Sequence, residues 1–395
     1  MDIRLSSRVS TVRPSPTLAV TARAAELKRQ GKDIVSLGAG EPDFDTPGPI
    51  KDAAKAALDR GFTKYTAVGG TPELKAAVAA KFARDNGLEF RASQILVSVG
   101  GKQSFFNLCQ ALLNPGDEVI IPAPYWVSYP DMVLLAEARP VILDTDIGVQ
   151  FKISAEQLAA AITPRTRLLV LNSPSNPSGM AYSRAELAAL GEVLRAHPEV
   201  LIASDDMYEK ILFGDAPFVN IANACPDLLP RCIIMNGVSK AYAMTGWRIG
   251  YCAGPSALIS AMETVQSQST SNPCSIAQAA AQSALDSGDT LLTPMLQAFT
   301  RRHQYVYDRL RTLPGVAVLP SAGTFYSFPN VQGVMQSRGI DSDLQLAEQL
   351  LEAGVAVVPG SAFGSPGHLR LSFATSDENL RLALDRIGAY ITAPA

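Results

Sequence analysis

Lys240 and Arg248 stand eight residues apart in a stretch of small residues, and their types and spacing could do chemistry. The small residues between Ser239 and Gly246 leave room for a flat carbonyl compound to approach the backbone. A lysine amine at such a place can form a Schiff base with that carbonyl. Arg248 supplies a fixed positive charge that suits a phosphate. Taken alone, two such residues are more often an ordinary basic pair beside a loop.

Asp205 and Tyr208 follow the apolar run 200–203, which is typical of a buried strand. A carboxylate at the carboxyl end of a parallel strand faces the crevice where open α/β sheets bind ligands, and Tyr208 can reach the same crevice. If the bound carbonyl compound contains a pyridine ring, an anionic Asp205 would keep the ring nitrogen protonated. An ion pair between the two at about 4 Å is worth about 4 kcal/mol at an effective dielectric of about 20. The alternative is a helix or turn cap.

Two further motifs lie next to predicted elements: an asparagine after a strand and a glycine pair before a helix. Asn176 comes after the apolar strand 168–171, and its amide can donate to a phenolate-like oxygen without adding charge. An ordinary turn is the alternative, because Asn, Pro and Gly dominate turns. Gly100 and Gly101 precede the helical run 103–113. Backbone N–H groups at the start of a helix, together with the helix dipole, favour binding of a phosphate.

The composition excludes several classes of protein. The chain has 395 residues, enough for two or three domains, a net charge of −3 and 18% charged residues. Lys and Arg do not collect in runs, so nucleic acid is not an expected partner. No apolar stretch reaches about 18 residues and no signal peptide is evident, so we expect no membrane contact and a soluble, cytoplasmic protein.

Metal and nucleotide sites are not expected either. The five cysteines have neither CxxC spacing nor an even count, which disfavours a zinc site and a disulfide framework. The three histidines lack metal-ligand spacing, and we expect His197 and His303 at the surface. The segment 38–43 lacks the third glycine of a dinucleotide fingerprint, and Gln103 stands where a P-loop needs Ser or Thr.

Strand and helix patterns alternate from about residue 50 to 290. Strands are predicted at 95–99, 118–122, 168–172, 200–204, 232–236 and 249–253. This alternation predicts an α/β fold with a mainly parallel sheet between helices. From about 290 onward, a long charged helix and predicted strands at 316–318, 325–328, 355–358 and 369–371 indicate a smaller α+β domain.

These motifs, in their order along the chain, resemble the class I pyridoxal-phosphate-dependent aminotransferases of fold type I, and within them the bacterial aspartate aminotransferases. The resemblance runs nearly end to end through Leu37–Phe44, Tyr65, Gly100–Lys102, Tyr125–Trp126, Asn176–Gly179, Asp205 with Tyr208, Ser239–Lys240, Gly246–Arg248 and His368–Ser372. It implies three parts: an N-terminal arm and part of the small domain at 1–47, a large cofactor domain at 48–290, and a small C-terminal domain at 291–395.

The resemblance implies pyridoxal 5′-phosphate as cofactor and Lys240 as the residue that forms the Schiff base and moves protons. Asp205 would hold the cofactor ring protonated. Tyr208 and Asn176 would donate to the ring oxygen, and their hydrogen bonds would lower the pKa of the imine. Trp126 would stack on the ring face.

For the phosphate, the resemblance implies the amides of Gly101 and Lys102, the Ser239 hydroxyl and the Arg248 guanidinium. Tyr65 would reach the phosphate of the neighbouring subunit. The expected active unit is therefore a homodimer with shared sites.

On the substrate side, Arg370 is the candidate for the α-carboxylate, because a guanidinium pairs with a carboxylate through two parallel hydrogen bonds; a structural salt bridge is its alternative. Gly40 would assist, and Trp126 and Asn176 would also face the substrate. Lys102 stands where the resembling enzymes bind a distal carboxylate. The implied reaction moves an amino group between L-aspartate, or another acidic or aromatic amino acid, and 2-oxoglutarate, so the partners are small amino acids and 2-oxo acids.

The N-terminal segment bears on the choice of substrate. Ser15 and Thr17 match the substrate-side segment of the resembling enzymes. Some close relatives use prephenate and carry a lysine at the position of Arg13. Arg13 keeps that charge but changes its length and shape, so prephenate stays an open acceptor.

Three alternatives remain. A pyridoxal-phosphate lyase or an aminotransferase with other substrates would keep Lys240, Asp205 and Arg248 and differ in substrate-facing residues. A transcription regulator with an aminotransferase-like domain would need a DNA-binding domain before residue 36, where the motifs already begin. A binding protein that has lost catalysis is also conceivable, although Lys240 and Arg370 are both present.

Overall fold

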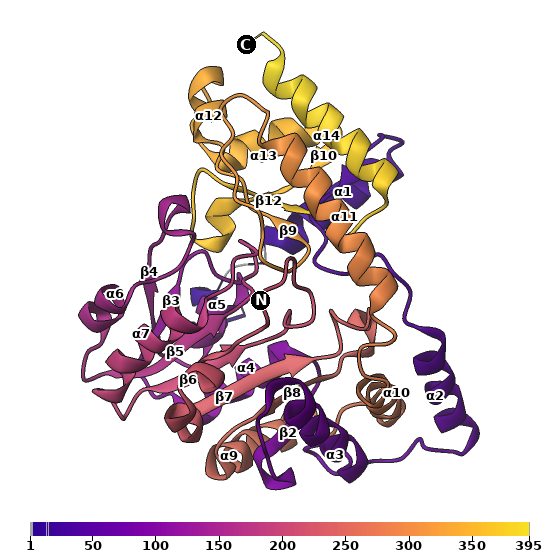
Figure 1. The fold of residues 1–395 in the computed structure, drawn as a ribbon, viewed down its shortest axis with the longest axis vertical. Helices are drawn as coiled ribbons and strands as arrows, with labels where there is room; N and C mark the ends of the chain where they lie inside the picture. The colour runs from indigo at the N-terminus through magenta and orange to yellow at the C-terminus, as the bar shows by residue number, and fades with distance from the viewer. Residues whose placement is uncertain (1–2, 13, 15, 395) are drawn as a thin grey trace.

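The computed structural model describes residues 3–12, 14 and 16–394. Its largest feature is a seven-stranded sheet in the order β2-β8-β7-β6-β5-β3-β4 (Figure 1). The strands are β2 (Ile95–Ser98), β3 (Glu118–Pro122), β4 (Arg139–Leu143), β5 (Thr166–Asn172), β6 (Leu201–Asp205), β7 (Cys232–Gly237) and β8 (Gly250–Ala253). Strand β8 is antiparallel to both of its neighbours, and the other neighbouring pairs are parallel. The predicted mainly parallel sheet is confirmed.

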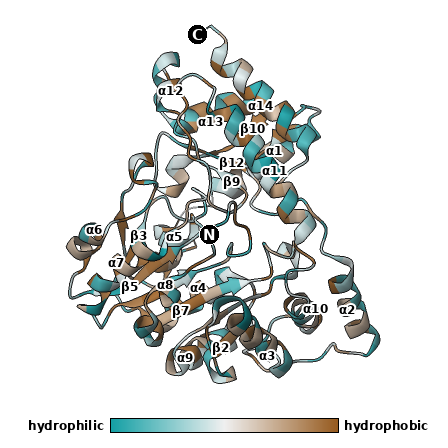
Figure 2. Ribbon diagram, in the orientation of Figure 1, coloured by the Kyte–Doolittle hydropathy of each residue, from teal (hydrophilic) through white to brown (hydrophobic). Residues whose placement is uncertain are grey.

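Helices cover both faces of this sheet. Along β7, Cys232 and Ile234 join one buried cluster while Ile233 and Met235 join another, because successive strand residues point to opposite faces. Helices α4 (Gly101–Leu112), α5 (Ser128–Leu135) and α9 (Ser256–Ser267) contribute to the second cluster. The first cluster receives α2 (Gly48–Asp59), α3 (Pro72–Lys81), α6 (Ala155–Ala161), α7 (Arg184–Arg195), α8 (Ile221–Ala224) and α10 (Ser275–Asp286). The strands are therefore mainly apolar, as the brown colour of β5 in Figure 2 shows.

Local sequence explains where the covering helices begin. Ser183 caps α7 by accepting a hydrogen bond from the Glu186 amide, and the Glu186 side chain bonds back to the Ser183 amide. Such a cap is worth about 1 kcal/mol. Leu187, Leu190 and Leu194 then lie at the spacing of one helical face and are buried against the sheet.

The N-terminal segment packs with the last third of the chain, in the upper part of Figure 1. Strand β1 (Val35–Ser36) pairs in parallel with β10 (Val355–Ala356). A second small sheet has the order β11-β12-β9 and is antiparallel. Its strands are β9 (Tyr326–Ser327), β11 (Val358–Pro359) and β12 (Leu369–Ser372), and the helices here are α1 (Pro16–Arg29), α11 (Thr293–Leu310), α12 (Gln332–Arg338), α13 (Asp343–Glu352) and α14 (Asp377–Thr392).

Several strand assignments differ from those predicted. The strand predicted at 355–358 is divided between β10 and β11, which belong to different sheets, and β1 was not predicted. The predicted strand 316–318 is wrong: only Ala317 pairs, through an isolated bridge to Asn330. Pro314, Gly315 and Pro320 flank the segment, and proline removes a donor that a longer ladder would need. Strand β4 was not predicted, because it contains a proline. It is an edge strand, where a missing amide donor is tolerated.

His303 is not at the surface, which corrects a second expectation. Its side chain is buried, its Nε2 accepts from the Ser321 amide at 3.0 Å, and its ring stacks on Phe213 with centroids 4.4 Å apart. Burial lowers the pKa of His303 to about 4, so the ring is neutral and can accept. His303 therefore packs as a satisfied core histidine.

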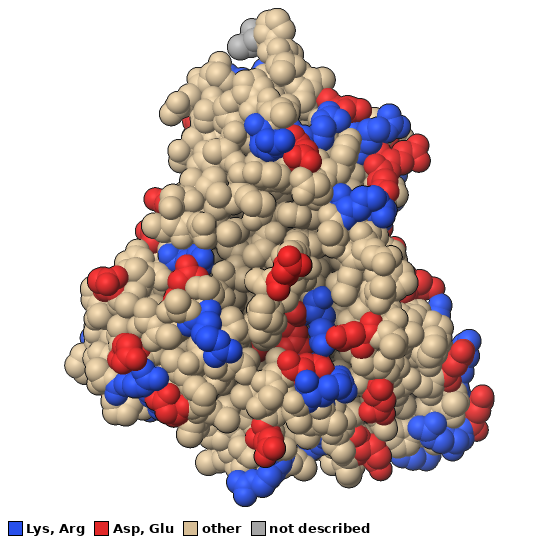
Figure 3. All heavy atoms as spheres, in the orientation of Figure 1, with Lys and Arg blue, Asp and Glu red and all other residues tan. Residues whose placement is uncertain are grey.

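The described residues offer neither a membrane-crossing helix nor a metal-binding cluster. None of their helices combines the length and the apolar character that crossing a bilayer requires. They also contain no group of three or more His, Cys, Asp or Glu side chains arranged to hold a metal ion. Figure 3 shows acidic and basic side chains interspersed over the face that it presents.

Candidate active site

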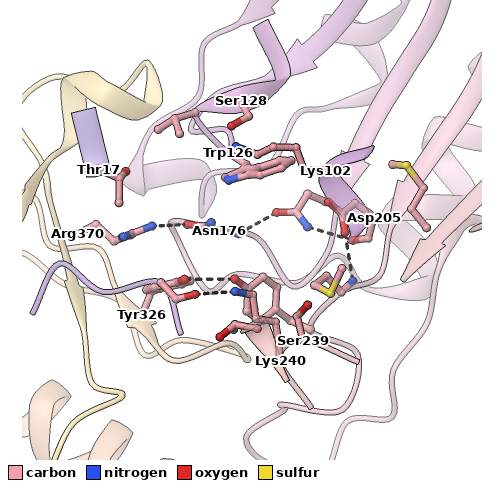
Figure 4. A pocket seen from close by; sticks show the side chains of 18 of the residues that line it. Thr17, Lys102, Trp126, Ser128, Asn176, Asp205, Ser239, Lys240, Tyr326 and Arg370 are labelled. Atoms are coloured by element: carbon pink, nitrogen blue, oxygen red, sulfur yellow. Dashed lines mark hydrogen bonds between the residues drawn. The ribbon is translucent and has the colours of Figure 1, made fainter. Parts of the chain in front are cut away.

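A pocket lies where the carboxyl ends of β5 and β6 meet the small sheet. Asn172 and Asp205 end those two strands and both line it, as expected for a ligand crevice of an open α/β sheet. In Figure 4, Arg370 and Asp205 lie toward opposite ends of the pocket, and Trp126 and Lys240 lie on opposite sides. The lining residues are Thr17, Gly40, Gly101, Lys102, Trp126, Val127, Ser128, Asn172, Asn176, Asp205, Met207, Tyr208, Met235, Ser239, Lys240, Thr245, Arg248, Tyr326 and Arg370.

The Asp205 carboxylate is held from several directions. The Tyr129 hydroxyl donates to Oδ2, and the Met207 amide donates to Oδ1 at 3.2 Å. The Asn172 amide donates to the Asp205 carbonyl oxygen at 3.0 Å, which fixes the end of β6. Burial raises the pKa of Asp205, whereas the Tyr129 bond, the Met207 amide and the charge of Lys240 oppose that rise. The carboxylate has a fixed direction toward the pocket.

Lys240 follows β7, and its amine points into the pocket. Nζ donates to the Gly40 carbonyl oxygen at 2.5 Å. Burial, followed by the charges of Arg370 and Arg248, lowers the pKa of Lys240 to about 8, against the opposing pull of Glu41 and Asp205. About a tenth of such an amine is neutral at pH 7. The amine can therefore act as a nucleophile or a proton acceptor near physiological pH.

Arg370 lies on β12 with 2% of its surface exposed. Nη1 donates to Asn176 Oδ1 at 3.0 Å and Nη2 donates to the Gly38 carbonyl oxygen at 2.9 Å. The guanidinium carbon lies 4.4 Å from the ring centroid of Tyr326 and 4.9 Å from that of Phe363. Among the described residues, nothing accepts from the buried Nε. A buried donor without a partner is a place where a ligand acceptor fits.

Arg248 is brought close to the start of α4 by a glycine. A Cβ built on Gly100, whose φ is +84°, would lie 2.3 Å from Arg248 Nη2. Only glycine allows both this backbone conformation and this approach. The guanidinium is oriented by Nη1, which donates to the Thr245 carbonyl oxygen at 2.8 Å. The positive charge therefore adds to the N-terminal end of a 12-residue helix.

Lys102 and Trp126 meet on one side of the pocket. The Lys102 amine lies 5.1 Å from the ring centroid of Trp126, within range of a cation–π contact. Burial, followed by the charge of Arg248, lowers the pKa of Lys102, and Asp131 opposes that effect. Thr17 and Ser128 line the pocket as well.

Two tyrosines at the site were not predicted from the sequence. Tyr326 lines the pocket with its hydroxyl 3.2 Å from that of Tyr208, and the hydroxyl of Tyr129, which does not line the pocket, donates to Asp205. Both belong to segments typical of buried elements, so their hydroxyls gave no local signal. The separations of 118 and 76 residues along the chain hide both pairings from any local pattern.

Most of the predicted site residues lie in this one pocket: Thr17, Gly40, Gly101, Lys102, Trp126, Asn176, Asp205, Tyr208, Ser239, Lys240, Arg248 and Arg370. Tyr65 does not line it, and its side chain is 91% exposed. Arg13 and Ser15 lie outside the described residues.

The charge of the described lining is strongly unbalanced. It carries Lys102, Lys240, Arg248 and Arg370 but only one carboxylate, that of Asp205. Arg370 is buried and Lys240 is half-buried, whereas Lys102 and Arg248 are exposed. Four cations beside one carboxylate suit a ligand with several negative groups. Phosphate and carboxylate groups are the anions that arginine binds best.

Comparisons with known proteins show which family the chain is similar to. A family model described as aminotransferase class I and II matches residues 32–387. The aspartate/prephenate aminotransferase of Nitrosomonas europaea is 59% identical over 400 residues, covering 99% of this chain and 100% of that protein. The aspartate aminotransferase of Geobacillus stearothermophilus is 50% identical and covered in full, as is this chain.

Solved structures give the same result. The crystal structure of the aspartate aminotransferase from Rhizobium meliloti matches with a TM-score of 0.95 at 49% identity, covering 99% of both chains. The aspartate aminotransferase from Thermus thermophilus with maleate matches with a TM-score of 0.92 at 45% identity, covering 99% of this chain and 100% of that one.

Proposed function

This chain belongs to the class I and II aminotransferases, and on that premise we propose that it transfers the amino group of L-aspartate to 2-oxoglutarate with pyridoxal 5′-phosphate as cofactor. The products are oxaloacetate and L-glutamate. One observation carries the proposal: a lysine amine whose pKa is lowered to about 8 faces a pocket with three further cations and one carboxylate. Prephenate is included as a further acceptor, because the relative from Nitrosomonas europaea carries that substrate in its name.

The residues present fit this cofactor. Arg248, Ser239 and the first amides of α4 would hold the phosphate, and the bare Cα of Gly100 leaves the Arg248 guanidinium room beside those amides. Asp205 would face the pyridine nitrogen, with its carboxylate already oriented by Tyr129. When bound, the cofactor supplies a carbonyl for the lysine and an electron-withdrawing ring for the charge at the substrate Cα.

Three further lining residues complete the proposed cofactor site. Tyr208 and Asn176 would donate to the oxygen on the cofactor ring, and Trp126 would cover one face of that ring. Support comes from burial, since Tyr208 and Asn176 are 4% and 7% exposed and therefore keep fixed orientations.

Proton transfer and substrate binding are assigned to three cationic residues, Lys240, Arg370 and Lys102. The Lys240 amine would move a proton between the substrate Cα and the cofactor carbon C4′, because its lowered pKa leaves part of it neutral at pH 7. Arg370, fixed by two hydrogen bonds and two aromatic rings, holds the α-carboxylate. The Lys102 ammonium would bind the distal carboxylate that distinguishes aspartate from monocarboxylic amino acids.

We extend the proposal to a homodimer. Tyr65 is 91% exposed and lies outside the pocket of its own chain, which supports a role toward the phosphate of a second copy. Arg13, Ser15 and the cytoplasmic location stay predictions from the sequence, and Thr17 stays a proposed substrate-side residue.

The proposal is tested by the absorbance spectrum of the purified protein before and after aspartate is added. A pH-sensitive band near the visible should convert to a shorter-wavelength form with acidic amino acids and be absent from Lys240→Ala. Keto acid should form in proportion to amino acid consumed. A released fragment instead would indicate a lyase, and no spectral change with any amino acid would overturn the transaminase function.

A further inference from the structure

We propose that Tyr326 is a positioning residue for both ends of the site. Its hydroxyl donates to Tyr208 and so directs the Tyr208 proton into the pocket, while its ring holds the Arg370 guanidinium in place. The inference rests on the proposed function, since it assigns a ligand oxygen to Tyr208 and a carboxylate to Arg370.

The two hydroxyl oxygens lie 3.2 Å apart, and their side chains are 4% and 1% exposed. They come from different parts of the fold: Tyr208 follows β6 of the large sheet, and Tyr326 lies on β9 of the small one. Burial raises the pKa of both phenols, so both keep their protons. Two protonated hydroxyls therefore share one hydrogen bond, in which one donates and the other accepts.

A phenol has one proton and can also accept. If Tyr208 donates to Tyr326, it has no proton left for a ligand oxygen. If Tyr326 donates to Tyr208, the Tyr208 proton is free to point into the pocket, and Tyr208 becomes a stronger donor because its own oxygen is polarised. A ligand oxygen that accepts from Tyr208 selects the second arrangement. The hydroxyl of Tyr326 thereby supports a hydrogen bond that it does not itself make.

The ring of Tyr326 has a separate role. Strands β9 and β12 are antiparallel with Tyr326 opposite Ser372, so Arg370 lies two residues along on the same face of the sheet. The guanidinium carbon consequently lies 4.4 Å from the Tyr326 ring centroid. The ring restrains the guanidinium through a cation–π contact while its two Nη atoms remain bonded to Asn176 and Gly38.

The two roles can be separated by substitution. Tyr326→Phe removes the hydroxyl and keeps the ring, whereas Tyr326→Leu removes both. Tyr208→Phe removes the direct donor and serves as the reference for the hydroxyl effect. Each variant is purified as holoenzyme and checked by circular dichroism, and Tyr326→Met repeats the ring experiment if the leucine variant does not fold.

The first readout is the pH titration of the cofactor absorbance band. Y326F should raise the pKa of the band by about half a unit to one unit, in the same direction as Y208F, because a hydrogen bond to the deprotonated oxygen is weakened. The double variant should titrate like Y208F alone, since Tyr326 acts through Tyr208. A Y326F band that titrates like the wild type would overturn the role of the hydroxyl.

The second readout is the dissociation constant of maleate, a dicarboxylate that cannot react. Y326L should bind maleate about 10-fold more weakly and raise KM more than it lowers kcat, whereas Y326F should bind it within about twofold of the wild type. Unchanged binding to Y326L would overturn the role of the ring. If the wild type itself lacks the absorbance band, the proposed function fails and the inference fails with it.

Discussion

Lys81 and Glu209 form an ion pair whose side chains are only 3% and 4% exposed, next to the turn that carries Tyr208. Asn86 closes the arrangement: its Oδ1 accepts from Lys81 at 2.7 Å and its Nδ2 donates to Glu209 at 2.8 Å. The end of α3 is thus tied to the segment after β6, and each buried charge has its partner. This network supports the turn from Asp205 onward without touching the pocket.

Breaking this pair should destabilise the fold. Lys81→Met leaves the Glu209 carboxylate buried without its cation, which costs about 3–5 kcal/mol. The midpoint of urea unfolding should therefore fall strongly and recover in part when Glu209→Gln is added. Lys55→Met is the matched control, because Lys55 and Asp52 pair at the surface with 70% exposure each and should leave the midpoint unchanged. Equal midpoints for both lysine variants would contradict the prediction.

Gly100→Ala should weaken cofactor binding. The added methyl group would lie 2.3 Å from Arg248 Nη2 and push the guanidinium from its place beside α4. Loss of one charge-assisted contact corresponds to about a 10- to 100-fold higher dissociation constant for pyridoxal phosphate in reconstitution titrations. Gly116→Ala has a similar φ of +88° with nothing within 4 Å, so it carries the backbone strain alone and should bind the cofactor normally. Similar losses in both variants would show that strain is the cause.

The amine of Lys240 should titrate near pH 8 in cofactor-free protein. Burial and the neighbouring charges disfavour the ammonium form, so the neutral, reactive amine is lost as pH falls through about 8 rather than through the ordinary 10.5. The rate of modification by an amine-selective reagent, followed against pH by peptide mass spectrometry, measures this midpoint. Arg370→Met removes one repelling charge and should move the midpoint upward. A wild-type midpoint near 10.5 would refute the lowered pKa.

Lys102→Met should reduce the preference for dicarboxylic substrates. The Lys102 side chain is exposed to solvent, so its pair with a carboxylate is worth about 1 kcal/mol and kcat/KM for aspartate should fall about fivefold. Phenylalanine, which has no distal carboxylate, serves as the internal control and should change by less than about threefold. A parallel loss for both amino acids would place the effect of Lys102 on the cofactor instead.

Much of the large sheet could be predicted because its signals are local. The apolar runs that became β3, β5 and β7 are buried on both faces, so their composition alone identifies them. Strand β4 was not predicted because Pro140 lies within it. Proline is tolerated there because β4 is at the edge of the sheet. His303 was misjudged because its burial depends on Phe213, 90 residues earlier in the chain.

The sequence by itself determined the types of the reactive groups and the ends of the elements that carry them, such as Asp205 at the end of β6 and Lys240 after β7. Residue type and strand pattern are properties of short segments. The tertiary structure alone decided the pairings of Tyr326 with Tyr208 and of Tyr129 with Asp205, together with the lowered pKa of Lys240. Burial and distance between remote segments exist only after the chain has folded, so no local pattern could contain them.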